Sequence, residues 1–126
     1  MKQIIFSPKA PAPLGPYSQA VKVGNTLYVS GQIAIDQETG QMVNSDIVAE
    51  THQVMKNMSY ILDAAGLDFS HVVKCSIFVK DLANFQTING VYGSYFNEAT
   101  APARETVEVA RLPKDVNIEI SCVACA

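Results

Sequence analysis

The sequence predicts an α+β domain in which one mixed β-sheet carries two helices on the same face. Two segments place apolar residues at helical spacing, and several shorter segments alternate between apolar and polar residues as strands do. These segments follow one another in the order β-β-α-β-α-β-β. A chain of 126 residues has room for a single such domain, residues 1–126, and for no second core.

The first two strands form a hairpin after a lead that prolines interrupt. Residues 20–23 and 26–30 are suited to strands, and the Gly24-Asn25 pair between them is suited to a tight turn of two residues. An additional short strand is expected at each end of this N-terminal part.

The first helix follows a turn at residues 36–40. Ser45 or Asp46 can cap its N-terminus, and Gly66 ends it. The apolar positions at helical spacing are Ile47, Val48, Val54, Met55, Met58, Ile61, Leu62 and Ala65. This spacing predicts a helix with one face packed on the sheet.

A strand and a second helix come next. From Val73 to Lys80 the pattern has period two, which places Val73, Cys75, Ile77 and Val79 on one face. Asp81 caps the second helix, whose apolar stripe extends from Leu82 to Phe96 although Gly90 and Gly93 each cost about 1 kcal/mol relative to alanine.

The last two strands, residues 105–111 and 117–124, are joined by residues 112–116. We expect them to form a hairpin that turns around Lys114. That register places Arg104 near Cys125 and Glu119 opposite Ala110. The offset of six residues separates Arg104 from Glu119 by about 20 Å along the strands.

Composition limits the classes of partner. The net charge of −3 and the pI near 5.2 provide no basic surface for nucleic acid. With 48% hydrophobic and 17% charged residues, the chain is more apolar than an ordinary globular domain. We therefore expect part of its surface to be buried against other chains, as in an oligomer.

The remaining signals favour a cytoplasmic protein without a cofactor or metal. Prolines interrupt the N-terminus, and no apolar run approaches membrane-spanning length, so no membrane partner is expected. Cys75, Cys122 and Cys125 are an odd set, which favours reduced thiols. On a strand, Cys122 and Cys125 point to opposite faces, which argues against a shared metal or redox site. His52 and His71 have no metal-ligand spacing.

Three segments resemble the Rid (reactive intermediate deaminase) family, and the likeness runs almost from end to end. They are Gly15-Pro16-Tyr17-Ser18, Ser30-Gly31-Gln32, and residues 101–120 with their Pro102-Ala103-Arg104 motif. The resemblance implies a chorismate-mutase-like fold that assembles as a homotrimer. In that assembly three sheets form a central barrel and the helices lie outside.

The resemblance also implies roles for two charged residues. Arg104 would hold the carboxylate of a small substrate, where a planar guanidinium suits two-pronged binding; the alternative is a surface arginine at a strand start. Glu119 would hold an attacking water; the alternative is a solvated carboxylate. The expected hairpin holds Arg104 and Glu119 of one chain too far apart to reach one small substrate. If both act on it, the pocket lies between subunits.

Further pocket residues follow from the same resemblance. Tyr17 would enter the pocket, Ser30 would supply a hydroxyl, and Gly31 would let a ligand approach the backbone. Tyr17 and Ser30 would act in catalysis by orienting the imine nitrogen or relaying a proton. Asn89 would be a polar pocket residue on the second helix, and Thr106 would contribute backbone contacts. The alternatives are a loop aromatic for Tyr17, a strand end for Ser30 and Gly31, and a core hydrogen bond for Asn89.

The family's activity sets the functional hypothesis. The chain would hydrolyse 2-imino acids, formed from enamines such as 2-aminoacrylate and 2-aminocrotonate, to 2-keto acids and ammonia. The alternative is a non-catalytic module that binds or senses a small 2-keto acid. Ribonuclease activity, attributed to some relatives, is disfavoured by the acidic charge balance and by the lack of clustered basic and aromatic residues.

Overall fold

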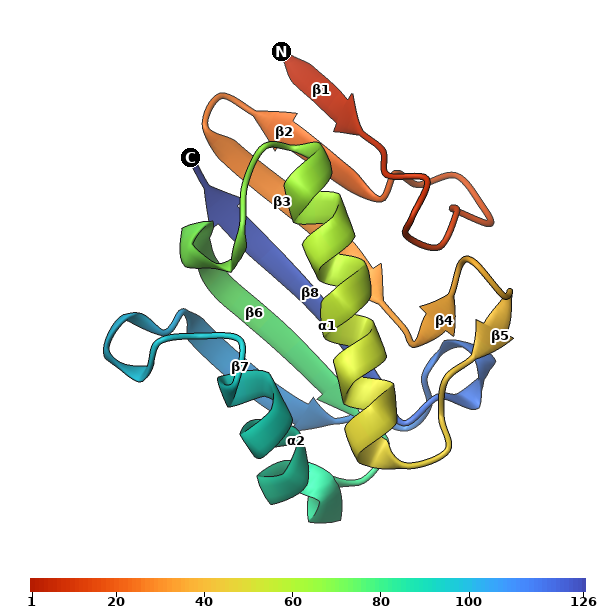
Figure 1. Cartoon of the computed structure of the whole chain (residues 1–126). Coiled ribbons are helices and arrows are strands. Elements are labelled where there is room, and N and C mark those ends of the chain that lie inside the picture. Colours follow the sequence, from red (N-terminus) through yellow and green to blue (C-terminus); the bar gives the residue numbers. More distant parts are fainter.

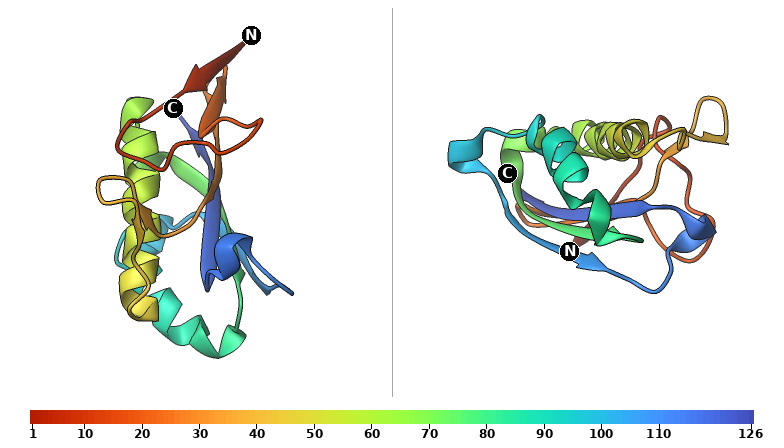
Figure 2. Two further views of the ribbon diagram at one scale, coloured as in Figure 1. Left: turned by 90° about the vertical axis from the view of Figure 1, so that its right-hand side faces the viewer. Right: turned by 90° about the horizontal axis from the view of Figure 1, so that it is seen from below.

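The computed structural model describes residues 1–126 as a six-stranded mixed sheet with both helices on one face (Figure 1). Two perpendicular views show the two layers, helices on one side and the bare sheet on the other (Figure 2). The main elements are β1 (Lys2–Ile5), β2 (Ala20–Val23), β3 (Thr26–Gln32), α1 (Ile47–Ala64), β6 (Val72–Val79), α2 (Phe85–Gly93), β7 (Ala103–Glu108) and β8 (Ile118–Cys125). The predicted α+β fold class is confirmed.

The N-terminal part matches its prediction. The β2–β3 hairpin turns at Gly24, whose φ of 58° lies in the left-handed region that glycine tolerates. The short strands expected on either side are β1, which pairs with β2, and the two-stranded ribbon of β4 (Ile35–Asp36) and β5 (Gln41–Met42).

Helix α1 begins and ends at the predicted signals. The side chain of Asp46 accepts a hydrogen bond from the backbone N–H of Ala49, and Gly66 adopts a φ of 74° just past the helix. Met55, Met58 and Ile61 are fully buried and belong to a core cluster of 22 residues that joins the helix to the sheet. Hydrophobic burial along this face fixes the helix on the sheet.

Strand β6 departs from the predicted alternation at its start. Its register with β8 shifts between Val72 and Lys74, so Val72 is buried and Val73 is 49% exposed. The prediction that Val73 shares the buried face of Cys75 is wrong, because the irregularity adds one residue to the alternation.

Helix α2 is shorter than its apolar stripe suggested. Asp81 caps a short 3-10 turn at Leu82–Asn84, and the α-helix then runs from Phe85 to Gly93. Beyond it, Phe96 packs in a cluster with Tyr92 and Phe69 against the core. The stripe predicted apolar packing correctly but overestimated the length of the helix.

The predicted C-terminal hairpin is wrong. Across the sheet the strands lie in the order β1-β2-β3-β8-β6-β7, so β6 separates β7 from β8. β7 pairs with β6 in parallel and β8 pairs with β6 antiparallel. Arg104 therefore lies beside Cys75 rather than near Cys125, and Glu119 lies beside Phe78 rather than opposite Ala110.

Burial explains the central position of β8. Ile118, Ile120 and Ala124 are fully buried beneath the helices. If β8 formed a hairpin with β7 at the edge of the sheet, the helices would cover this row less well. At the centre of the sheet, β8 lies beneath α1 and contacts it directly. The connection through α2 supplies the crossover that a parallel β6–β7 pair requires.

The sheet face without helices carries an apolar row that crosses four strands. Ile4 pairs with Val21, Val21 with Tyr28, and Tyr28 with Val123. Ile4 and Tyr28 are each 53% exposed in the single chain. Large exposed apolar surfaces mark interaction sites, so the expectation of an oligomer applies to this face.

Neither helix of the structure is both long enough and apolar enough to cross a lipid bilayer.

Candidate functional site

Helix α2 holds the side chain of Arg104 against the helical layer. Arg104 pairs with Cys75, whose side chain is buried in the core, and so it lies on the helix-bearing side of the sheet. Its Nη1 donates a hydrogen bond to Oδ1 of Asn89. The guanidinium carbon also lies 5.2 Å from the ring centroid of Tyr92 and 5.7 Å from that of Phe85, at cation–π distance.

These contacts leave the guanidinium suited to bind an anion. Arg104 is exposed and has five N–H donors, of which the structure assigns one to Asn89. It borders a cavity of about 520 Å³ that Asn89, Tyr92, Phe96 and Pro102 also line. A small carboxylate in this cavity could accept two parallel hydrogen bonds from the remaining donors.

Two buried hydroxyl groups on the same side of the sheet have no hydrogen-bond partner. They are Oη of Tyr92 and Oγ1 of Thr106. Thr106 lies two residues beyond Arg104 on β7 and so shares its side of the sheet. Burial and the neighbouring Cys75 raise the pKa of Tyr92, which keeps its hydroxyl protonated.

Glu119 lies on the opposite side of the sheet, between two fully buried isoleucines. Its side chain passes over Gly31, where any Cβ would overlap the carboxylate oxygen Oε2. Glycine is therefore required at position 31 for Glu119 to lie as it does. Burial raises the pKa of Glu119, which moves the carboxylate toward the range useful for proton transfer near neutral pH.

Tyr17 and Ser30 lie near Gly31, at a register irregularity in β3 between Val29 and Gln32. Tyr17 and Gly31 line a cavity of about 200 Å³. The hydroxyl of Ser30 donates to the carbonyl of Ser18 at 2.6 Å, which ties the strand to the loop that carries Tyr17. In this chain Ser30 therefore supports the position of Tyr17.

The predicted site residues form two half-sites. Arg104, Asn89 and Thr106 lie on the helix side, whereas Glu119, Gly31, Tyr17 and Ser30 gather around the irregularity in β3. The strand registers align Glu119 on β8 with Val107 on β7, two strands away. Val107 lies three residues beyond Arg104, so Glu119 and Arg104 are offset by three residues along the strands and by two strands across the sheet. That corresponds to about 10 Å along the strands and about 9.5 Å across them, with the side chains on opposite faces.

The buried cysteines are unsuited to nucleophilic or redox chemistry. Cys75 and Cys122 are directly paired across β6 and β8, and burial raises the pKa of both thiols. Cys125 is exposed at the end of β8, on the other face from Cys122. No group of three or more His, Cys, Asp or Glu side chains lies close enough together to hold a metal ion.

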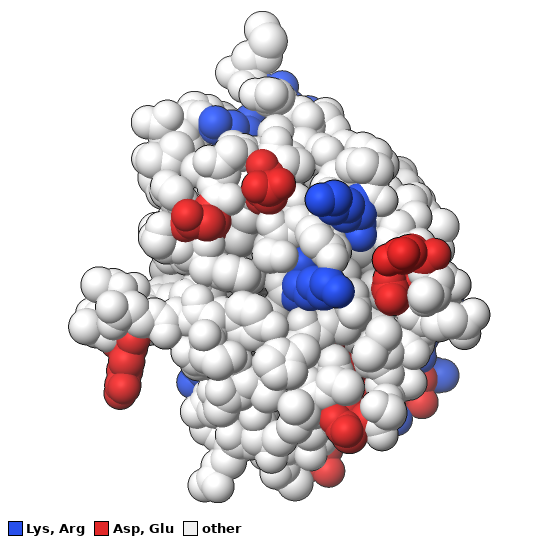
Figure 3. All heavy atoms as spheres, viewed as in Figure 1, with Lys and Arg blue, Asp and Glu red and all other residues white.

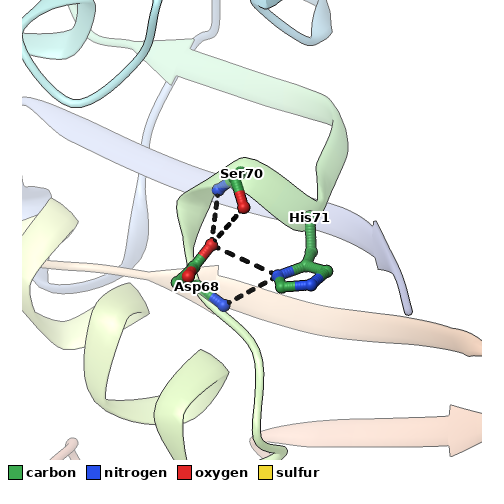
Figure 4. Close-up of polar contacts among 3 residues, drawn as sticks. All are labelled: Asp68, Ser70 and His71. Atoms are coloured by element: carbon green, nitrogen blue, oxygen red, sulfur yellow. Dashed lines mark hydrogen bonds and ion pairs between the residues drawn. The ribbon is translucent and has the colours of Figure 1, made fainter.

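Asp68, Ser70 and His71 have the residue types of a hydrolytic triad but not its connections (Figure 4). The hydroxyl of Ser70 donates to Asp68 Oδ1, and His71 Nδ1 faces the backbone N–H and the carboxylate of Asp68. A nucleophilic serine would have to donate to the histidine. The three residues form the capping box of a 3-10 turn.

The helix-bearing face offers no second strong candidate for an anion site. Its positive and negative side chains are scattered over a largely uncharged surface (Figure 3). A cavity of about 470 Å³ there is lined by Lys9 and Lys56 but also by Asp36 and Glu38. The opposite charges cancel, so this cavity provides no net attraction for a carboxylate.

Fold and site together define a small α+β protein with an arginine half-site and a glutamate half-site on opposite faces of one sheet. The sequence profile of the endoribonuclease L-PSP family matches residues 7–126. The chain belongs to this family, which includes the Rid and RutC proteins.

Similar proteins extend over the whole chain. A RutC family protein of Pyrococcus horikoshii is 51% identical over 124 residues, covering 98% of each chain. The 2-iminobutanoate/2-iminopropanoate deaminase of Mus musculus is 44% identical and covers 98% of this chain and 91% of its own.

Solved structures match equally well. A putative endoribonuclease of Thermotoga maritima superposes with a TM-score of 0.96 at 46% identity, covering 100% of this chain and 98% of its own. E. coli TdcF with bound serine superposes with a TM-score of 0.92 at 40% identity, covering 98% of each chain.

Proposed function

We propose that this protein is a 2-iminobutanoate/2-iminopropanoate deaminase, which hydrolyses reactive 2-imino acids to 2-keto acids and ammonia. Its substrates would be the imines that arise when 2-aminoacrylate and 2-aminocrotonate tautomerise. The relative that bears this activity in its name is 44% identical along nearly the whole chain.

The observation that carries the proposal is that the chain presents an exposed, preorganised guanidinium and, on the other face of the sheet, a carboxylate of raised pKa. Asn89, Tyr92 and Phe85 hold Arg104 in a fixed geometry beside a cavity. Burial raises the pKa of Glu119. A 2-imino acid needs these two functions, an anchor for its carboxylate and a proton acceptor for a water molecule.

The reaction requires only water and proton transfers. Arg104 holds the substrate carboxylate while Glu119 takes a proton from a water molecule whose oxygen adds to the imine carbon. The proton passes to the nitrogen, the C–N bond breaks, and its electron pair leaves with ammonia as the carbonyl forms. The steps consume one imine and one water and release one keto acid and one ammonia, and no cofactor takes part.

The arrangement of half-sites supports a pocket between subunits. Arg104 and Glu119 of one chain lie on opposite faces of the sheet, so a small molecule bound to one is out of reach of the other. In a homotrimer, Arg104 of one subunit would face Glu119 of the next, and the apolar row of Ile4, Val21, Tyr28 and Val123 would be buried.

The other predicted residues complete this pocket. Asn89 orients Arg104, and the unpartnered hydroxyl of Thr106 together with its backbone lies next to the arginine. Ser30 supports the loop of Tyr17 through Ser18, and Tyr17 would close the glutamate half-site and contact the imine nitrogen. Gly31 leaves room for Glu119 and for the ligand.

A coupled assay tests the activity. A dehydratase generates 2-aminoacrylate from serine, and the purified protein is expected to accelerate the release of pyruvate. Arg104→Ala is expected to abolish the acceleration, while Arg111→Ala, which removes an exposed arginine elsewhere, leaves it intact. An Arg104→Ala variant that retains the wild-type rate would reject the assignment.

One observation favours a second candidate, a non-catalytic sensor of small carboxylates. TdcF was solved with serine, an amino acid rather than an imine. A sensor would bind 2-ketobutyrate in calorimetry without hydrolysing imines, and Glu119→Gln would keep its function. A chain with net charge −3 makes the ribonuclease activity in the family's name a poorer candidate.

A further inference from the structure

Glu50 is a fully buried carboxylate that no ion pair of the structure neutralises. It lies in the first turn of α1 with 0% of its surface exposed. Burying an isolated carboxylate is costly, and an apolar side chain would pack at this position without that cost. The charge at position 50 therefore calls for a role beyond packing.

Both oxygens of Glu50 are used to hold Asn117. Oε2 accepts the backbone N–H of Asn117 at 2.8 Å, and Oε1 accepts its side-chain Nδ2–H at 2.8 Å. The positive end of the α1 dipole adds a favourable field for the carboxylate. Together these interactions clamp the N-terminus of α1 to one residue that is 67 positions away in the sequence.

Asn117 is the last residue before β8 and is held from the other side as well. Its carbonyl accepts the backbone N–H of Lys80 at 3.0 Å. The loop that precedes it contains Lys114 and Asp115 with φ of 55° and 54°, a conformation that non-glycine residues rarely adopt. An anchor at Asn117 keeps this strained loop from altering the start of the strand.

The start of β8 determines where Glu119 points. Glu119 is two residues beyond Asn117, and its carboxylate fits over Gly31 with no room for an added Cβ. Along a strand, a slip of one residue would turn the side chain to the helix side of the sheet, and a smaller shift would still move the carboxylate. Catalysis is sensitive to displacements of about 1 Å, which can cost about 100-fold in rate.

We propose that Glu50 is a positioning residue, which acts through Asn117 to hold Glu119 in its catalytic orientation. This inference rests on the proposed function, because it assigns Glu50 to the base of that reaction. Glu50 touches neither the substrate nor the water, and its effect is confined to the glutamate half-site. The arginine half-site, built on β7 and α2, makes no hydrogen bond with Glu50.

The test compares Glu50→Gln with a control variant, Glu38→Gln, which makes the same chemical change at an exposed residue. Glutamine at position 50 can still pair with Asn117 if the Asn117 amide turns over, but both hydrogen bonds then lose the charge of the carboxylate and become weaker. We expect kcat to fall by about 10-fold or more with KM within about twofold of wild type. Glu38→Gln is expected to match the wild type in both.

A double variant separates this role from general stabilisation. If Glu50 acts through Glu119, then Glu50→Gln adds no further loss of kcat to Glu119→Gln. A multiplicative loss in the double variant would overturn the proposal. So would a Glu50→Gln enzyme that melts at a lower temperature but retains the wild-type kcat.

A titration that needs no turnover keeps the two proposals distinguishable. The carboxyl ¹³C resonance of Glu119, assigned by its absence from Glu119→Gln, reports the pKa that burial raises. Glu50→Gln is expected to move this titration to lower pH, because a displaced carboxylate becomes better solvated. If the wild type proves inactive on imines, the proposed function fails, and an unchanged titration would independently reject the role of Glu50.

Discussion

Mixing two inactive variants provides a direct test of a pocket shared between subunits. Arg104→Ala retains Glu119, and Glu119→Gln retains Arg104. If the protein assembles as the proposed homotrimer, every site in either variant lacks one of the two groups. Hydrogen bonds to charged groups contribute about 1.5–3 kcal/mol each, so loss of a two-pronged contact to Arg104 is expected to lower the activity by about 100-fold or more.

The strand registers determine how much activity mixed trimers recover. Arg104 and Glu119 of one chain lie on opposite faces of the sheet, so each complete site would combine two chains. A trimer that contains both variants has one interface where an intact arginine meets an intact glutamate. After random reassembly of equal amounts, about three quarters of the trimers are mixed and about one quarter of all sites are intact.

The assay is pyruvate release after the two variants are unfolded together and refolded. Different affinity tags allow the mixed trimers to be isolated, and light scattering confirms their mass. A recovery of about one quarter of the wild-type rate in the whole mixture, or of about one third in the isolated mixed trimers, supports the shared site. Mixed trimers that form but stay as inactive as either parent would refute it, because sites contained within one chain cannot complement. A monomeric wild type would refute the assembly itself.

Three further outcomes are expected. Gly31→Ala introduces a Cβ that overlaps the Glu119 carboxylate, so this carboxylate must move and kcat is expected to fall by about 10-fold or more. A wild-type kcat would contradict this. Burial raises the pKa of Glu119, and a base must be ionised to accept a proton, so kcat/KM is expected to decline as the pH falls through that raised pKa. If the same decline persists in Glu119→Gln, Glu119 is not its source. Gln19 is 2% exposed, and its side chain makes four hydrogen bonds to residues 7–11. Gln19→Ala is therefore expected to lower the free energy of unfolding by about 1–3 kcal/mol, measured by urea unfolding at fixed protein concentration. An unchanged unfolding midpoint would show that these bonds are dispensable.

Local signals in the sequence were sufficient for helix α1 and the first hairpin. Asp46 caps α1 through its own side chain, Gly66 takes the left-handed conformation that stops the helix, and Gly24 turns the hairpin. Each of these depends on a few neighbouring residues. Tertiary packing does not change them, so the sequence predicted these elements correctly.

The order of the last two strands could not be obtained from local signals. Residues 109–117 pass from one side of β6 to the other, since Val109 N–H donates to Val79 and Lys80 N–H donates to Asn117. The segment is short enough for a hairpin, which made adjacency the natural expectation. The crossover through α2 was the missed signal, because a strand, helix and strand in succession favour a parallel β6–β7 pair.

The same error misplaced Arg104 relative to Glu119. The predicted hairpin placed them about 20 Å apart along two adjacent strands. The structure places them on opposite faces, with a smaller offset along the strands. The contacts of Arg104 with Phe85 and Tyr92 were also missed, because both aromatic residues were assigned only to the apolar stripe of a helix.

The two half-sites depend on different parts of the fold, which makes binding and catalysis separable. Arg104 is held by α2 and the edge strand β7, whereas Glu119 depends on the irregularity in β3 and on the start of β8. Strand β6 lies between them. Substitutions in α2 should therefore act mainly on KM, and those around Gly31 mainly on kcat. Only assembly would bring the halves together, so a variant that weakens subunit association should lose turnover while each isolated chain retains both half-sites intact.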